Sequence, residues 1–119
     1  MQLNEIRFEG ATPIDGYGPG FFRIAGQVLE GAICVTATGA HSWGGYGDAQ
    51  SLLALADDID VVFIGTGGDI AYVPEELRRR LEEAGLGVEA MNSPAAARTY
   101  NVLLSEGRRV AAALLPVEA

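Results

Sequence analysis

The run Asp60-Val61-Val62-Phe63-Ile64-Gly65-Thr66-Gly67-Gly68 indicates the fold class of the chain. Its apolar residues are uninterrupted from Val61 to Ile64, which is typical of a central strand that is buried on both faces of a sheet. The glycines that follow predict a tight turn at the carboxyl end of this strand. The segments on either side of the strand then decide the architecture.

These segments alternate between helical and extended patterns. A helix is expected around Ser51–Ala56 with Asp48 as its N-cap, because its apolar residues have helical spacing. Pro74 is expected as the first residue of a second helix, in which Glu75 would pair with Arg79 and Glu76 with Arg80. Three further elements are expected: a strand over Gly87–Met91, a helix from Ser93 (N-cap) and Pro94 to Glu106, and a strand over Arg109–Leu115.

The N-terminal third is rich in extended patterns. Phe21–Ile24 and Gln27–Glu30 flank the turn signal Ala25-Gly26 and predict a hairpin. Asn4–Phe8 alternates polar and apolar residues, and Ala32–Ala37 has the composition of a buried strand. Together with the alternation downstream, this predicts one domain over residues 1–119. It is an α/β fold, a three-layer α/β/α sandwich with a mixed, largely parallel sheet and a β-hairpin-rich N-terminal part.

Charge and composition exclude several classes of partner. The 119 residues carry a net charge of −8, which repels nucleic-acid backbones and anionic lipid. No apolar run approaches the ~18 residues of a membrane span, so direct membrane insertion is not expected. Met1–Arg7 lacks the pattern of a secretory signal, and the single Cys34 suits a reducing compartment. We therefore expect a cytoplasmic protein.

The glycine turn and the start of the last helix form one candidate ligand site. Ligands of α/β sheets bind at the carboxyl ends of strands, and backbone N–H groups of a turn or a helix start attract anions. An arginine one turn into the helix could clamp a carboxylate or phosphate. A tight turn and an ordinary capped helix explain the same residues without a ligand. The candidate ligand-binding residues are Gly65, Thr66, Gly67, Ser93, Arg98 and Asn101.

A second candidate surface would bind a protein partner. Trp43 lies in a glycine-rich loop, where an aromatic ring can anchor an interface or close one end of the core. The outer face of the last helix is polar. The candidate partner-binding residues are Trp43, Tyr46, Arg98 and Ser105.

No complete catalytic constellation is visible in the sequence. His41 is the single histidine and Cys34 the single cysteine, so a metal site and a cofactor are not expected. Cys34 lies in the middle of an expected strand, where a thiol is usually an inert core residue. We assign no catalytic residue, although a small-ligand enzyme stays open as an alternative.

Three motifs together resemble one known family. They are Ile14–Ile24, Ile59–Gly67 and Ala97–Leu114, and the resemblance extends over roughly Ile6–Val117. The chain is similar to a small uncharacterised domain family that includes the mitochondrial NADH:ubiquinone oxidoreductase complex assembly factor 3. Relatives often read Met-Asp-Thr where this chain has Met91-Asn92-Ser93. They also often carry a cysteine where this chain has Ala97, so a shared thiol chemistry is not expected.

The resemblance implies a function without naming a reaction. It implies a three-layer α/β domain, and for the eukaryotic relative a role through binding partners during respiratory complex assembly. The first hypothesis is a non-catalytic binding or assembly module with a protein partner, acting on a respiratory or membrane protein complex. The alternative is a small anionic-ligand-binding protein or enzyme. A homo-oligomer that buries the edge of the N-terminal hairpin is a third possibility.

Overall fold

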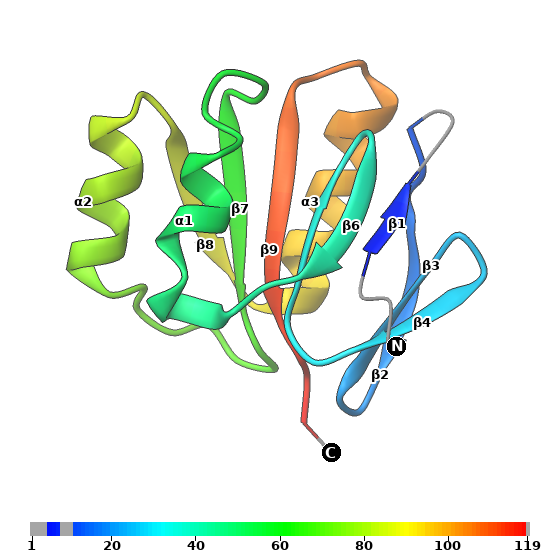
Figure 1. Cartoon of the computed structure of the whole chain (residues 1–119). Helices are drawn as coiled ribbons and strands as arrows, with labels where there is room; N and C mark the ends of the chain where they lie inside the picture. Colours follow the sequence, from blue (N-terminus) through cyan, green and yellow to red (C-terminus); the bar gives the residue numbers. More distant parts are fainter. Residues whose placement is uncertain (1–4, 8–10, 119) are drawn as a thin grey trace.

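The computed structural model describes residues 5–7 and 11–118 of the chain. Within these residues the chain forms a mixed α/β fold with two β-sheets and three α-helices (Figure 1). The helices are α1 (Ala49–Leu53), α2 (Glu75–Glu83) and α3 (Ser93–Ser105), and a short 3₁₀ turn, η1 (Gly45–Gly47), precedes α1. The strands are β1 (Glu5–Arg7), β2 (Ile14–Gly18), β3 (Phe21–Ile24), β4 (Gln27–Glu30), β5 (Ile33–Thr36), β6 (Gly39–Ser42), β7 (Val61–Thr66), β8 (Gly87–Met91) and β9 (Val110–Leu115).

The large sheet has the strand order β1-β6-β5-β9-β7-β8 in the part of the chain that the structure describes. Strands β8 and β9 run parallel to β7, whereas the pairs β5–β9, β5–β6 and β1–β6 are antiparallel. The prediction of a largely parallel sheet was therefore wrong. The short link between β5 and β6 permits only an antiparallel neighbour, while α2 and α3 supply the long crossovers that parallel strands need.

Two groups of buried side chains lie on opposite faces of the large sheet. Helices α1 and α2 lie on one side of this sheet and α3 on the other (Figure 1). Along β7, Val62 and Ile64 belong to the group under α1 and α2, and Phe63 belongs to the group under α3. The continuous apolar run of this strand is thus explained by burial on both faces. Strand β9 is equally buried, and three of its six residues are alanines, whose small side chains allow helices to approach the sheet closely.

The small sheet has the order β2-β3-β4 and packs with α3 on one face of the large sheet. Strands β3 and β4 pair antiparallel across the Ala25-Gly26 turn, where both residues have positive φ. Phe22, Ile24 and Leu29 bury their side chains against the core. Residues 4 and 8 of the expected Asn4–Phe8 strand lie outside the described residues.

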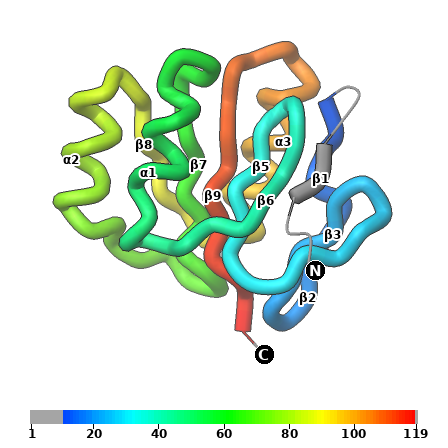
Figure 2. Tube along the Cα trace, in the orientation of Figure 1, coloured from blue at the N-terminus to red at the C-terminus, as the bar shows by residue number. Residues whose placement is uncertain are grey.

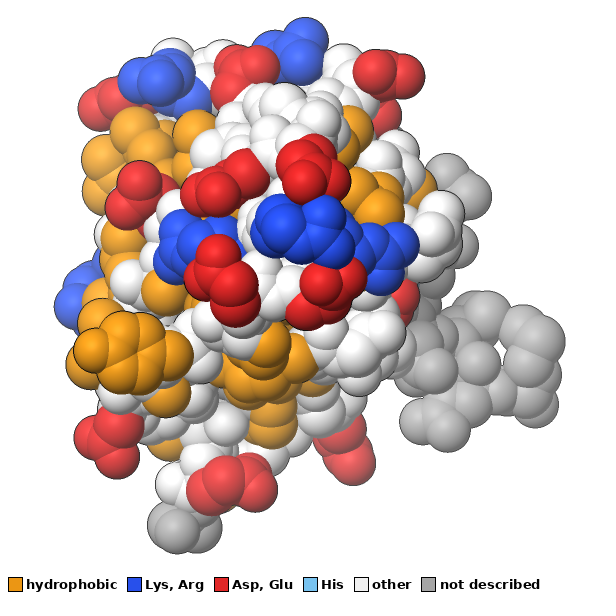
Figure 3. Space-filling view, turned by 90° about the vertical axis from the view of Figure 1, so that its left-hand side faces the viewer, with side chains coloured by type: hydrophobic (Ala, Val, Ile, Leu, Met, Phe, Trp, Pro, Cys, Tyr) orange, Lys and Arg blue, Asp and Glu red, His pale blue; other side chains and the backbone are white. Residues whose placement is uncertain are grey.

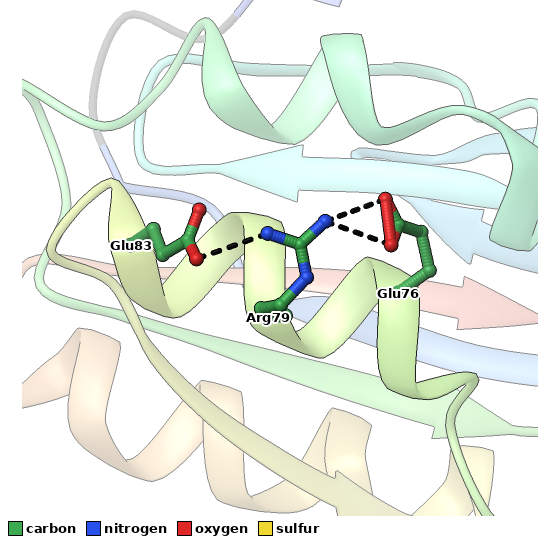
Figure 4. Close-up of polar contacts among 3 residues, drawn as sticks. All are labelled: Glu76, Arg79 and Glu83. Carbon is green, nitrogen blue, oxygen red and sulfur yellow. Dashed lines mark hydrogen bonds and ion pairs between the residues drawn. The ribbon is translucent and has the colours of Figure 1, made fainter.

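Helix α2 begins and pairs differently from the sequence prediction. Pro74 is the N-cap, with ψ 134°, and the helix starts at Glu75. Arg79 contacts Glu76 at 2.7 Å and Glu83 at 2.9 Å, in place of the predicted Glu75–Arg79 and Glu76–Arg80 pairs (Figure 4). The guanidinium reaches along the helix to both carboxylates at once, which lowers the pKa of Glu76. These side chains are exposed, so solvent screens the pairs and they contribute little to stability.

Tyr100 of α3 is fully buried, and its hydroxyl has no hydrogen-bond partner among the described residues. Burial raises the pKa of this hydroxyl far above its ordinary value. An unsatisfied buried donor costs about 1–3 kcal/mol, so Tyr100→Phe is expected to raise the free energy of unfolding by about 1 kcal/mol. Urea unfolding of the two proteins measures this difference. A marked loss of stability would instead indicate that the hydroxyl bonds a buried water.

Candidate functional site

The turn after β7 and the start of α3 meet at the carboxyl end of the parallel strands of the large sheet, as the sequence predicted. The backbone N–H of Gly67 donates to Ser93 Oγ at 2.9 Å, and Ser93 N–H donates to the Gly67 carbonyl at 2.7 Å. Ser93 Oγ also donates to the Leu115 carbonyl at the end of β9, at 2.6 Å. Figure 2 shows the end of β9 passing the turn that follows β7. Ser93 thereby joins the carboxyl ends of two strands to a helix.

Gly65 permits this close approach. A Cβ atom at Gly65 would lie 2.6 Å from Ser93 Oγ, 2.9 Å from Ser93 Cα and 2.7 Å from Leu114 Cδ2. Such distances are far inside van der Waals contact, so only glycine fits at the end of β7. The glycine is required by packing between β7 and α3, and its φ is not positive.

Thr66 closes the loop that follows. Its hydroxyl accepts a hydrogen bond from Ala71 N–H at 3.1 Å and lies 2.7 Å from the Asp69 carbonyl and 3.2 Å from the Met91 carbonyl. The loop is therefore held both internally and against β8. Because the polar atoms of Thr66 and Ser93 are bonded within the chain, this junction is a structural joint between strands and helix.

Asn101 and the cap of α3 are engaged away from this joint. Asn92, not Ser93, caps α3, because its Oδ1 accepts from Ala95 N–H at 2.8 Å while Ser93 is committed to the sheet. Asn101 bonds the backbone of Ile14 in both directions at 2.9 Å and ties α3 to the small sheet. Arg98 is exposed on α3. The structure thus brings Gly65, Thr66, Gly67 and Ser93 together without Asn101, and an anion site there stays a prediction.

Trp43 closes the core and is only 4% exposed. Its Nε1 donates to the Asp48 carbonyl at 3.0 Å, and its ring meets Tyr46 edge to face at 6.2 Å between centroids. Trp43 packs with the side chains under α1 and α2, whereas Arg98 and Ser105 are exposed on α3, on the other face of the large sheet. The four predicted partner-binding residues therefore do not form one continuous surface.

Asp48 holds the loop that carries Trp43 and Tyr46, and it caps α1 as predicted. Its carboxylate accepts from Ser51 Oγ at 2.6 Å, Ser51 N–H at 3.1 Å and Gly44 N–H at 3.0 Å. These bonds, led by the one from the Ser51 hydroxyl, hold the pKa of Asp48 below its ordinary value.

The lowered pKa of Asp48 predicts a pH-dependent contribution to stability. A group whose pKa is lower in the folded state stabilises fully above its unfolded pKa of about 3.9, and loses this effect as the pH falls through the folded pKa. Asp48→Asn keeps a good N-cap but cannot ionise. Urea unfolding is expected to give a wild-type advantage over Asp48→Asn at pH 7 that shrinks below pH ~4. A difference independent of pH would contradict the charge-assisted cap.

An apolar groove lies between the loop before α2 and strand β8. Its cavity volume is about 520 Å³. Two of its side chains are strongly exposed, Ile70 at 70% and Tyr72 at 99%. Figure 3 views the side of the molecule that carries α2, where hydrophobic side chains gather beside and below the charged ones. We call this feature the β8 groove, and it is lined by Ile70, Ala71, Tyr72, Val73, Glu75, Arg78 and Ala90.

A second hollow of about 440 Å³ lies near the end of α3 and the start of β9. Arg108 and Arg109 line it together with Asp58. Arg109 is held by Asp60 at 3.6 Å and by the Asp57 carbonyl at 3.1 Å. Charged groups of both signs therefore line this hollow, namely the guanidinium groups of Arg108 and Arg109 and the carboxylate of Asp58.

The remaining reactive side chains are buried or isolated. Burial raises the pKa of the Cys34 thiol to about 12, and the charge of Asp48 adds to this effect, so the thiolate is not available at neutral pH. Within residues 5–7 and 11–118, no three His, Cys, Asp or Glu side chains converge as metal ligands. None of the helices described here is both long and apolar enough to cross a membrane.

The chain is similar to several known proteins. A family model described as "Protein of unknown function (DUF498/DUF598)" matches residues 14–115. An uncharacterised protein of Rhodobacter capsulatus is 53% identical over 117 residues, which cover 98% of this chain and 94% of that protein. NADH dehydrogenase (ubiquinone) 1 alpha subcomplex assembly factor 3 of Danio rerio is 34% identical over 123 residues, covering 98% of this chain and 71% of that protein.

A solved structure shares the fold. The crystal structure described as an outer membrane protein from Bartonella henselae superposes with a TM-score of 0.84 at 41% identity, covering 93% of this chain and 99% of that one. The family resemblance drawn from the three sequence motifs is confirmed by the family match and by the similarity to the assembly factor. On this evidence the chain belongs to the DUF498/DUF598 family of proteins of unknown function, which includes complex I assembly factor 3.

Proposed function

We propose that the chain is a non-catalytic protein-binding module that aids the assembly of a respiratory or membrane protein complex. The observation that carries this proposal is the exposure of Ile70 and Tyr72 beside the β8 groove. Adjacent exposed apolar side chains next to a concave surface are typical of a site that binds another molecule. The binding partner would be a protein, because the net charge of −8 disfavours nucleic acid and anionic lipid.

The class of complex comes from the relatives. The zebrafish protein that aligns with 98% of this chain is named as an assembly factor for NADH dehydrogenase. Such a factor needs a stable scaffold and a binding surface, and the joint at Ser93 together with the β8 groove supplies both. The protein would act in the cytoplasm, where the lone buried thiol of Cys34 stays reduced.

A genetic complementation experiment tests this proposal. The gene for the 53% identical Rhodobacter capsulatus protein is deleted, and the present chain is expressed in its place. The deletion is expected to lower the amount of fully assembled NADH dehydrogenase in the membranes, measured by native gel electrophoresis and NADH oxidation. The chain is expected to restore that amount. Unchanged levels of assembled respiratory complexes in the deletion strain would overturn the proposal.

A further inference from the structure

Strand β8 ends the strand order of the large sheet, and its outer side pairs with no other described strand. Three hydrogen bonds fix which residues face inward. Gly87 N–H donates to the Asp60 carbonyl, and the Met91 carbonyl lies 3.2 Å from Thr66 Oγ1. The backbone N–H and carbonyl groups of Gly87 and Met91 therefore point toward β7. The Val88 carbonyl faces the other way, because it accepts from Arg78 Nη1 at 3.3 Å.

The alternation along a strand then places the backbone of Ala90 on the outer side as well. Ala90 is also the β8 residue that lines the groove. The groove therefore combines backbone hydrogen-bonding groups at a sheet edge with the exposed apolar side chains of Ile70 and Tyr72. Natural edge strands are protected by charged side chains, most often lysine, or by proline. Strand β8 contains no lysine or proline, and its one charged side chain is Glu89.

The charged side chains near the groove indicate which kind of partner would bind there. Glu75 lines the groove, Asp69 precedes the groove residue Ile70, and Glu89 lies on the opposite face of β8 from Ala90. All three are exposed, and none forms an ion pair with another described residue. The Arg78 guanidinium, which lines the groove, donates to the Val88 carbonyl and lies 3.5 Å from Glu82. Two copies of a chain with net charge −8 repel each other, whereas lysine or arginine on a partner would be attracted.

We propose that the β8 groove binds an extended segment of a partner protein that alternates basic and apolar residues. The segment adds as a strand along the outer side of β8, with its backbone bonded to Ala90 and its apolar side chains on Ile70 and Tyr72. Because side chains alternate along a strand, its basic side chains turn to the opposite face of the sheet, on which Glu89 is exposed. This inference rests on the proposed function, since it identifies the surface and the kind of segment through which the module binds.

The test uses the full ¹⁵N-labelled chain and a short synthetic peptide of alternating valine and lysine, titrated by NMR. Amide shifts are expected in the loop Asp69–Glu75 and in β8, and to weaken as salt is raised. A peptide with glutamate in place of lysine is expected not to bind. Shifts spread over the whole surface, or equal binding of both peptides, would overturn the proposal.

Matched variants distinguish binding through backbone strand pairing from binding through apolar side-chain contact alone. Tyr72→Ser removes a ring that is 99% exposed, so the fold is retained, and binding is expected to weaken about tenfold. Ala90→Pro removes an outward N–H and is expected to abolish binding, whereas Ala90→Ser keeps that N–H and binds normally. Val102→Ser, at a 55% exposed apolar residue of α3, serves as the surface control. Normal binding by both Tyr72→Ser and Ala90→Pro would overturn the proposal.

Two further measurements distinguish the other outcomes. Sedimentation that shows a dimer which the peptide dissociates would assign the groove to a second copy and overturn the proposal. In the complementation experiment, Tyr72→Ser is expected to fail where the wild-type chain succeeds. If both the variant and the wild-type chain restore the assembled complex, the β8 groove is not the binding site, while the proposed function stands. If the wild-type chain fails although the peptide binds as expected, the proposed function falls and the groove assignment stands.

Discussion

Gly65→Ala is expected to lower the free energy of unfolding by about 3 kcal/mol, because overpacking at a rigid contact costs this much. The added methyl group would meet Ser93 Oγ at 2.6 Å and Ser93 Cα at 2.9 Å. The hydroxyl cannot rotate away without losing its bonds to Gly67 and Leu115, and the Cα belongs to the backbone of α3. Urea unfolding followed by circular dichroism measures the loss.

Gly47→Ala is the matched control for this substitution. A Cβ atom at Gly47 meets nothing within 4 Å, and its φ is not positive. The change is expected to alter the free energy of unfolding by less than about 0.5 kcal/mol. Equal losses for the two variants would show that the effect comes from the backbone entropy of glycine and not from the contact with Ser93.

Ser93→Ala is expected to cost a similar amount, about 3 kcal/mol, through a different mechanism. The variant leaves the Gly67 N–H and the Leu115 carbonyl without their partner, in a place where Ser93 is fully buried. A buried polar group that loses its hydrogen bond pays the full cost of its removal from water. Hydrogen exchange at the Gly67 amide is expected to speed up together with the loss of stability in urea.

Ser105→Ala controls for the loss of a hydroxyl, since Ser105 is exposed and among the described residues bonds only the nearby Val102 carbonyl. Its expected effect is below about 0.5 kcal/mol. The double variant Gly65→Ala/Ser93→Ala provides a stricter check. Because Ser93→Ala removes the atom closest to the new methyl group, the double variant should lose less stability than the sum of the two single losses. Strict additivity would contradict direct contact between the two positions.

The sequence determined the elements of the second half of the fold. The apolar run Val61–Ile64 predicted a strand buried on both faces, and β7 is such a strand. Gly87–Met91 was predicted with the bounds that β8 has, and Asp48 caps α1 as predicted. These features follow from local chemistry, namely hydropathy period, turn glycines and capping side chains, which a single segment carries by itself.

The candidate site depended on contacts that no single segment carries. Local chemistry predicted Ser93 as an N-cap, yet two strands bring Gly67 and Leu115 to its hydroxyl, and Asn92 takes over the cap. The role of Trp43 also depends on its contacts in the folded chain. Its Nε1–H donates to the Asp48 carbonyl, and its ring is buried in the core. In neither case does the spacing of residues along the chain reveal the partner.

Strand order likewise came from the tertiary structure. Strand β9 pairs with β5 in the antiparallel sense, and β8 is left at an edge of the sheet. Both outcomes depend on how all the strands assemble between the two groups of buried side chains. The sequence therefore determined which segments form strands and helices, because periodicity and capping act over a few residues. Only the packed molecule decided that Ile70, Tyr72 and Ala90 meet at one groove, because contacts between distant segments exist only once the sheet is assembled.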